Sequence, residues 1–110
     1  MNYFQNPETP RQQKIREATN EIINYMDDGY SVTAAAKKAG INFNQPGNRM
    51  KILSDDLFYD RYLEFMFSRG VHNHLIDKEA VDRRGLEAVL ELKIKYAKQR
   101  EDQRRNRPFG

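Results

Sequence analysis

The stretch Ser31-Val-Thr-Ala-Ala-Ala-Lys-Lys-Ala-Gly-Ile41 decides the fold expected for this chain. Ser31 is a good N-cap for a short helix, and the alanines that follow let that helix approach a neighbouring helix closely. Gly40 ends the helix where a positive φ is needed, and Ile41 fills the angle to the next helix. The sequence therefore predicts a short helix followed by a tight turn.

A longer helix is expected before this stretch, over about residues 10 to 28. Thr9 and Gln12 have the spacing of a capping box, and Pro10 occupies the first helical position. Apolar residues then recur at helical spacing, and Gly29 stands where helix ends commonly need a left-handed residue.

A third helix is expected to begin at Pro46, capped by Asn44 or Gln45, with Met50 and Leu53 on its buried side. The three segments have the pattern of a helix-turn-helix. In that motif the third helix presents its N-terminal residues to the major groove of DNA.

The second half of the chain predicts two more helices. One covers about residues 56 to 69, and the other opens near Ile76 and Asp77 and runs to about residue 104. Because no alternating strand pattern is present, the predicted fold class is all-α, with five helices. The predicted organisation is a flexible arm over residues 1–8, a helix-turn-helix module over 9–54, a helical hairpin used for oligomerisation over 55–100 and a basic flexible tail over 101–110.

The composition excludes several classes of protein. With 110 residues the chain can form one small domain, or a small domain with an assembly element, which excludes most cofactor enzymes. It has no cysteine, which excludes disulfides, zinc knuckles and thiol nucleophiles. It also lacks a long apolar span and a leader pattern, so we expect a soluble protein that is not secreted and has no membrane partner and no cofactor.

The helix-turn-helix pattern indicates which side chains would contact double-stranded DNA. Amide and guanidinium groups can hydrogen-bond to base edges, whereas lysines can pair with phosphates. The alternative is that these polar residues form only a solvated face. The candidates for base contacts are Asn44, Gln45, Asn48 and Arg49, and the candidates for phosphate contacts are Lys37, Lys38 and Lys51.

The last two predicted helices are apolar over a wide arc. Aromatic and apolar residues on the fourth helix cover about 200° of its surface, and the last helix carries two apolar stripes, which is more than one neighbouring helix can cover. We therefore expect a homo-oligomer, the alternative being that the fourth helix is the buried centre of a monomer. The candidate interface residues are Phe58, Tyr62, Phe65, Met66, Leu86, Leu90 and Ile94.

The excess positive charge lies at the C-terminal end. Residues 93–110 carry seven basic and two acidic side chains, within a net charge of +3 for the chain. Such a run favours an acidic partner or nucleic acid, although a solvated helix end has the same composition. The candidate docking residues are Arg100, Arg104, Arg105 and Arg107.

No catalytic centre and no metal site is predicted. His72 and His74 are two residues apart, but Asp77 is the only further ligand type nearby. The sequence has no phosphate-binding glycine loop and no nucleophile elbow.

A longer pattern runs through the same region, formed by Thr33, Ala34, Ala35, Lys38, Ala39, Gly40, Gly47, Arg49, Met50, Leu53, Ser54 and Asp55. This pattern resembles the N-terminal module of bacteriophage terminase small subunits. The resemblance covers about residues 33 to 58 as a motif, and residues 10 to 100 as an order of helices. The family more often has serine, alanine or lysine where this chain has the segment from Phe43 to Gly47.

The resemblance implies a role in viral genome packaging in the cytoplasm of a bacterial host. Small terminase subunits assemble as rings, recognise viral DNA and regulate the ATPase and nuclease of the large terminase subunit, and they are not enzymes themselves. The large subunit commonly engages the C-terminal region of the small one, which makes the basic tail a candidate docking segment. The residues alone leave two alternatives open, a dimeric helix-turn-helix transcription regulator and a helical adaptor that does not bind DNA.

Overall fold

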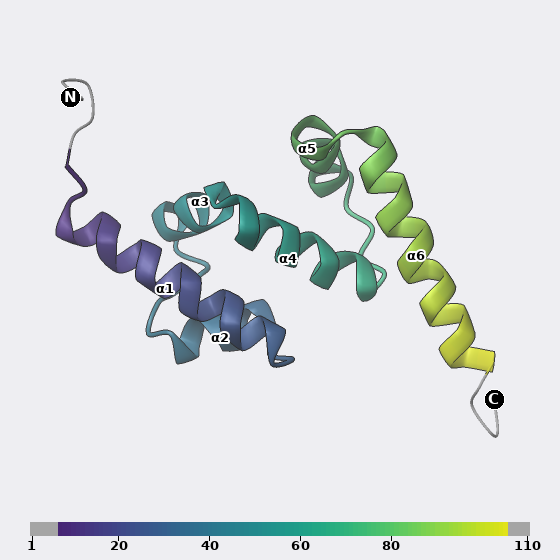
Figure 1. Ribbon diagram of the computed structural model, residues 1–110, viewed down its shortest axis with the longest axis horizontal. Coiled ribbons are helices and arrows are strands. Elements are labelled where there is room, and N and C mark those ends of the chain that lie inside the picture. The colour runs from purple at the N-terminus through teal and green to yellow at the C-terminus, as the bar shows by residue number, and fades with distance from the viewer. Residues whose placement is uncertain (1–6, 106–110) are drawn as a thin grey trace. The chain divides into compact units, whose positions relative to one another are not determined.

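The computed structural model describes residues 7–105, and six α-helices lie in this part of the chain (Figure 1). The described residues contain no β-strand, which confirms the predicted all-α fold class. In chain order the helices are α1 (Pro10–Asp27), α2 (Val32–Lys38), α3 (Pro46–Ser54), α4 (Asp56–Ser68), α5 (His74–Arg84) and α6 (Leu86–Arg105).

The first two helices begin at the predicted caps. The backbone N–H of Thr9 donates to Oε1 of Gln12 at 3.0 Å, and the backbone N–H of Gln12 donates to Oγ1 of Thr9 at 3.1 Å. Oγ of Ser31 accepts from the backbone N–H of Ala34 at 3.2 Å. Gly40 has a φ of +78°, so the left-handed residue predicted after α2 is confirmed.

The chain divides into two compact units, and the division falls inside α4. Unit 1 ends at Arg61 and unit 2 begins at Tyr62, whereas the sequence predicted a boundary between residues 54 and 55. Unit 1 therefore contains α1, α2, α3 and the first part of α4. Unit 2 contains the rest of α4 together with α5 and α6.

Unit 1 is built on the apolar face of α1. Both α2 and α3 pack against this helix (Figure 1). Ile22 of α1, Ala35 of α2 and Ile52 of α3 are fully buried, and Phe58 of α4 is buried with them. The ring of Phe58 lies 5.8 Å, centroid to centroid, from the ring of Phe43 in the connection between α2 and α3.

In unit 2, α5 packs against α6. Ala80 of α5 and Val89 of α6 are buried, as are Leu63 and Phe67 in the second part of α4. Nζ of Lys93 on α6 lies 2.5 Å from Oδ2 of Asp77 on α5, which links the two helices electrostatically. The core of unit 2 has fewer large buried side chains than that of unit 1.

The expectation of five helices is wrong, because the last predicted helix is two helices. Gly85 has a φ of +92°, and this left-handed residue separates α5 from α6. The first of the two also begins earlier than predicted, since Oδ1 of Asn73 accepts from the backbone N–H of Leu75 at 2.9 Å. An isolated glycine inside a helical pattern costs only about 1 kcal/mol, so the sequence alone did not indicate a break here.

Replacement of Phe58 by alanine is expected to lower the free energy of unfolding by about 3–5 kcal/mol, because the whole ring lies in the core of unit 1. Chemical denaturation followed by circular dichroism measures this loss. The matched control is Leu57→Ala, since Leu57 is on the same helix but 52% exposed, and its cost should stay within about 0.5 kcal/mol. Equal losses in the two variants would contradict this assignment of the core.

Candidate nucleic-acid interface

Residues 29–54 carry four cations and no carboxylate. This segment contains α2, α3 and the connection between them, and it is bounded by Asp27 and Asp28 on one side and by Asp55 and Asp56 on the other. All of its charged side chains are therefore cations, although the described part of unit 1 as a whole is close to neutral. We call this segment the cationic segment.

The two lysines of α2 are both exposed but have different neighbours. Nζ of Lys38 lies 4.9 Å from the centroid of the Tyr30 ring and 5.8 Å from that of Tyr25. Lys37 lines an open pocket together with Asn42 and Asn44 of the α2–α3 connection. Lys37 is thus next to this connection, and Lys38 is held near the end of α1 by cation–π attraction.

The connection between α2 and α3 has seven residues, 39–45, which is longer than the three- or four-residue turn of a standard helix-turn-helix. Its end is braced by the amides that the sequence assigned to base contacts. Nδ2 of Asn48 donates to the backbone carbonyl of Asn42 at 3.1 Å and to Oε1 of Gln45 at 3.2 Å. The backbone N–H of Asn44 donates to Oδ1 of Asn42 at 3.0 Å.

These hydrogen bonds give Gln45 and Asn48 a structural role in addition to the base contacts predicted for them. Gln45 occupies the N-cap position of α3, as predicted, but its side chain makes no capping hydrogen bond. It accepts from Asn48 instead, and Asn48 is half-buried. The hydrogen bond between these two amides therefore stabilises the conformation of the chain at the start of α3.

Arg49 is half-buried beside an aromatic ring. Its Cζ lies 4.9 Å from the centroid of the Phe43 ring, which in turn packs on Phe58. A guanidinium stacked on a ring keeps its planar donors directed along its edge. No local pattern in the sequence indicates this contact, because it depends on the fold of the α2–α3 connection.

The outward face of α3 differs from the predicted one. Met50 was expected on the buried side, but it is 74% exposed, and the fully buried position belongs to Ile52. Gly47 and Lys51 are exposed on the same face as Met50. The exposed face of the proposed recognition helix therefore carries a glycine, a methionine and a lysine.

One cation near this face was missed by the sequence analysis. A Cβ placed on Gly47 would lie 4.0 Å from Nη2 of Arg11, so this arginine of α1 reaches the first turn of α3. Only the packing of α3 against α1 brings the two together. Arg16 behaves differently, because Glu8 pairs with it at 3.0 Å and raises the pKa of its guanidinium through a hydrogen bond and opposite charge. Its charge is thus already compensated.

The predicted oligomerisation residues fall into two groups. Phe58 and Tyr62 are buried within the chain, so the expectation that a second copy covers them is wrong, because the chain's own packing removes them from water. Phe65 and Met66 are half-buried, and Cζ of Arg69 lies 4.4 Å from the centroid of the Phe65 ring. The residues that remain exposed are those of α6, namely Leu86, Leu90 and Ile94.

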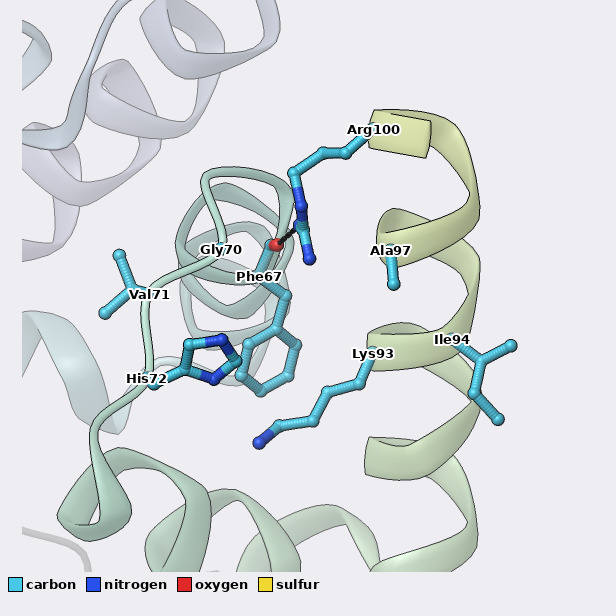
Figure 2. A pocket seen from close by; sticks show the side chains of 8 residues that line it. All are labelled: Phe67, Gly70, Val71, His72, Lys93, Ile94, Ala97 and Arg100. Atoms are coloured by element: carbon cyan, nitrogen blue, oxygen red, sulfur yellow. Dashed lines mark hydrogen bonds between the residues drawn. The ribbon is translucent and has the colours of Figure 1, made fainter. Parts of the chain in front are cut away.

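Arg100 was predicted to belong to a docking tail, but it is a structural residue of unit 2. Its Nη1 donates to the backbone carbonyl of Phe67 at 2.6 Å, at the C-terminal end of α4 (Figure 2). The same carbonyl also accepts from the backbone N–H of Gly70 at 3.0 Å, and a cation at this position complements the helix dipole. Arg100 is therefore engaged within its own chain.

The remaining tail residues lie at or beyond the end of α6. Residues 101–105 are helical rather than part of a flexible tail, and Arg104 and Arg105 are exposed there. Nη2 of Arg105 pairs with Oε1 of Glu101 at 2.7 Å. Arg107 lies outside the described residues, as do residues 1–6 of the predicted arm.

Unit 2 contains a pocket between the end of α4 and α6, and Phe67 and His72 are among the residues that line it (Figure 2). Both cations on its wall have partners within the chain, since Lys93 pairs with Asp77 and Arg100 with the Phe67 carbonyl. Over residues 7–105, His, Asp and Glu side chains form no cluster of three suited to a metal ion. In the same residues no helix has the length and apolarity to cross a membrane.

Comparison with known proteins adds no family assignment. No family model matches the chain, and no curated protein and no solved structure matches it significantly.

Replacement of Arg100 by glutamine is expected to loosen the end of α4, because a hydrogen bond between a charged donor and a carbonyl is lost. The backbone N–H groups of Gly70 and Val71, which donate to Phe67 and Met66, should exchange with solvent about tenfold faster, which corresponds to about 1.4 kcal/mol. Hydrogen exchange measured by NMR reads out both amides. Arg104→Gln is the matched control, and an equal acceleration in that variant would contradict the role given to Arg100.

Proposed function

We propose that unit 1 binds double-stranded DNA through the cationic segment, with α3 facing the major groove. The observation that carries this proposal is the run of four cations without a carboxylate over residues 29–54, folded so that α3 packs on α1 by one face and exposes the other. DNA phosphates attract such a surface whatever the base sequence. The segment itself contains no carboxylate, and Asp55, which follows directly after it, lines one pocket with Lys51.

The exposed face of α3 suits a close approach to DNA. Gly47 adds no side chain to the first turn, so the backbone can come near the duplex at that point. Met50 offers an apolar group of the kind that contacts thymine methyls, and Lys51 and Arg11, which lie near this face, are the cations proposed to contact phosphates. Lys37 would meet the backbone from the α2 side.

The amides and Arg49 have a revised place in this proposal. Asn48 and Gln45 shape the entry to α3, and Arg49 reaches bases only from its stacked position over Phe43. Direct base contact by these residues remains a prediction from the sequence. Met50 joins them as a contact suggested by the exposed face of α3, and Lys51 is kept as a phosphate contact.

The biological role proposed is that of a small terminase subunit, which recognises viral DNA and regulates the large subunit during genome packaging in the host cytoplasm. The support is the motif resemblance over residues 33 to 58, together with exposed apolar residues on α6 that suit a homo-oligomer. Arg104, Arg105 and Arg107 remain candidates for docking the large subunit. Arg100 is removed from that set, because it caps α4.

A dimeric transcription regulator is the second candidate. The observation that favours it is that Leu86, Leu90 and Ile94 lie along a single stripe of α6, and one stripe calls for one partner helix. A regulator of this kind would use the same DNA-binding surface in unit 1, with paired half-sites about one helical turn apart.

Replacement of Lys51 by glutamine tests the DNA-binding surface. Loss of a phosphate contact should weaken binding to all duplexes alike and reduce the slope of log affinity against log salt concentration by about one. Fluorescence anisotropy with a labelled duplex over a salt series measures both quantities. Lys78→Gln is the control, since Lys78 is an exposed lysine of α5 outside the cationic segment. If the wild-type protein binds no duplex at low salt, the adaptor function replaces this proposal.

Native mass spectrometry of the full chain tests the biological role independently of the DNA site. A closed assembly of many identical chains is expected for a small terminase subunit, because a ring repeats one interface around its axis. A clean dimer would favour the transcription regulator. A monomer at all accessible concentrations would contradict both oligomeric functions.

A further inference from the structure

The exposed apolar residues of α6 form one continuous stripe. Leu86, Leu90, Ile94 and Ala97 are all exposed, and at 100° per residue they fall within an arc of about 80°. The stripe extends about 16 Å along the helix, at 1.5 Å per residue. Ile94 and Ala97 also line the pocket next to Phe67, so the stripe borders the pocket along this part of α6 (Figure 2).

One flank of this stripe has charges of opposite sign at its two ends. Glu87 and Glu91 lie on this flank near the start of α6, and Lys98 lies on the same flank eleven residues after Glu87. All three side chains are exposed, and none of them forms an ion pair with another described residue. The flank therefore carries two carboxylates near the start of α6 and a lysine farther along, and none of the three is held in an ion pair within the described chain.

We propose that α6 pairs with α6 of a second copy of this chain in an antiparallel arrangement, with the two apolar stripes in contact. When two identical helices run antiparallel about a two-fold axis, each flank faces the same flank of the partner helix in the opposite direction. The acidic end of one flank therefore faces the basic end of the other. Glu87 of each copy then lies level with Lys98 of the other, with the axis between residues 92 and 93. A parallel pair would bring this flank against the opposite flank, whose cations Lys93 and Arg100 are already bound to Asp77 and to the Phe67 carbonyl within the chain.

This inference concerns unit 2 and does not depend on DNA binding by unit 1. It does constrain the assembly, because a two-fold contact is closed and joins chains only in pairs. A ring would need a second, head-to-tail surface in addition, so assemblies containing this contact have an even number of chains. An odd-numbered ring in which every chain is equivalent would overturn the proposal.

Cysteine cross-linking of the full chain tests the orientation directly, because the natural sequence has no cysteine. The two single variants are Glu87→Cys and Lys98→Cys. In the antiparallel pair the two copies of position 87 are about 16 Å apart along the helix, too far for a disulfide, which requires Cα atoms within about 7 Å. Each variant alone should remain unlinked under oxidation, whereas a mixture of the two should form the mixed disulfide. Self-linking of each variant, or no linking in the mixture, would overturn the antiparallel pair.

A charge-reversal series tests the ionic part. The double variant Glu87→Lys with Glu91→Lys places like charges opposite Lys98 of the partner copy and should weaken association, as should Lys98→Glu alone. The triple variant restores opposite signs and should recover the wild-type affinity. Failure of the triple variant to recover, measured by analytical ultracentrifugation, would count against the pairing of these two ends.

The apolar part is tested by Ile94→Lys, which should raise the dissociation constant of the pair by about tenfold or more, because the stripe would bury a lysine. The matched control is Leu75→Lys, since Leu75 is 72% exposed on α5 and Ile94 is 66% exposed on α6. Both variants should keep the helical circular dichroism of the wild type. A dissociation constant raised equally by the control, or a wild-type protein that stays monomeric throughout, would overturn the proposal.

Discussion

The contact between the rings of Phe43 and Phe58 is the constraint on which the arrangement of unit 1 depends. Phe43 lies in the seven-residue connection between α2 and α3, and its burial ties that connection to the start of α4. Arg49 stacks over the same ring, so the turn of α3 that bears Arg49 is held as well. Loss of this contact would free the connection to move, and the orientation of α3 would then no longer be determined. The orientation of the DNA-binding surface proposed for unit 1 thus depends on the buried contact between two aromatic rings.

The sequence predicted those features that depend on local interactions. The capping box at Thr9, the cap at Ser31 and the left-handed glycine at position 40 each involve residues within four positions of one another, and all three are present. The all-α class follows from the same local signals, since periodicity and caps are read along one helix at a time. Such features need no knowledge of which helix packs against which.

The sequence failed where packing between distant segments decides the outcome. Met50 and Ile52 are both apolar and two residues apart, and only the position of α1 determines that Ile52 is buried and Met50 exposed. The wide aromatic arc of α4 predicted a surface for a second copy, yet the chain itself covers Phe58 and Tyr62. Gly85 is a further case, because a helix with one glycine and two helices with a break there have similar local energies. The sequence accordingly predicted the helix α3 but not which of its faces is exposed.

Arg100 and Ile94 give α6 two roles, a polar contact within unit 2 and an exposed apolar stripe. Arg100 turns toward the end of α4 and donates to a carbonyl there, whereas Ile94 lies at the rim of the same pocket and stays largely exposed (Figure 2). The polar contact holds α6 in place within unit 2, and this fixed position keeps the apolar stripe on the outside. Because a stripe on a rigid helix has lost its freedom before a partner arrives, association pays less conformational entropy than it would for a loose tail. The same cap that removes Arg100 from the predicted docking residues therefore favours α6 as the assembly surface.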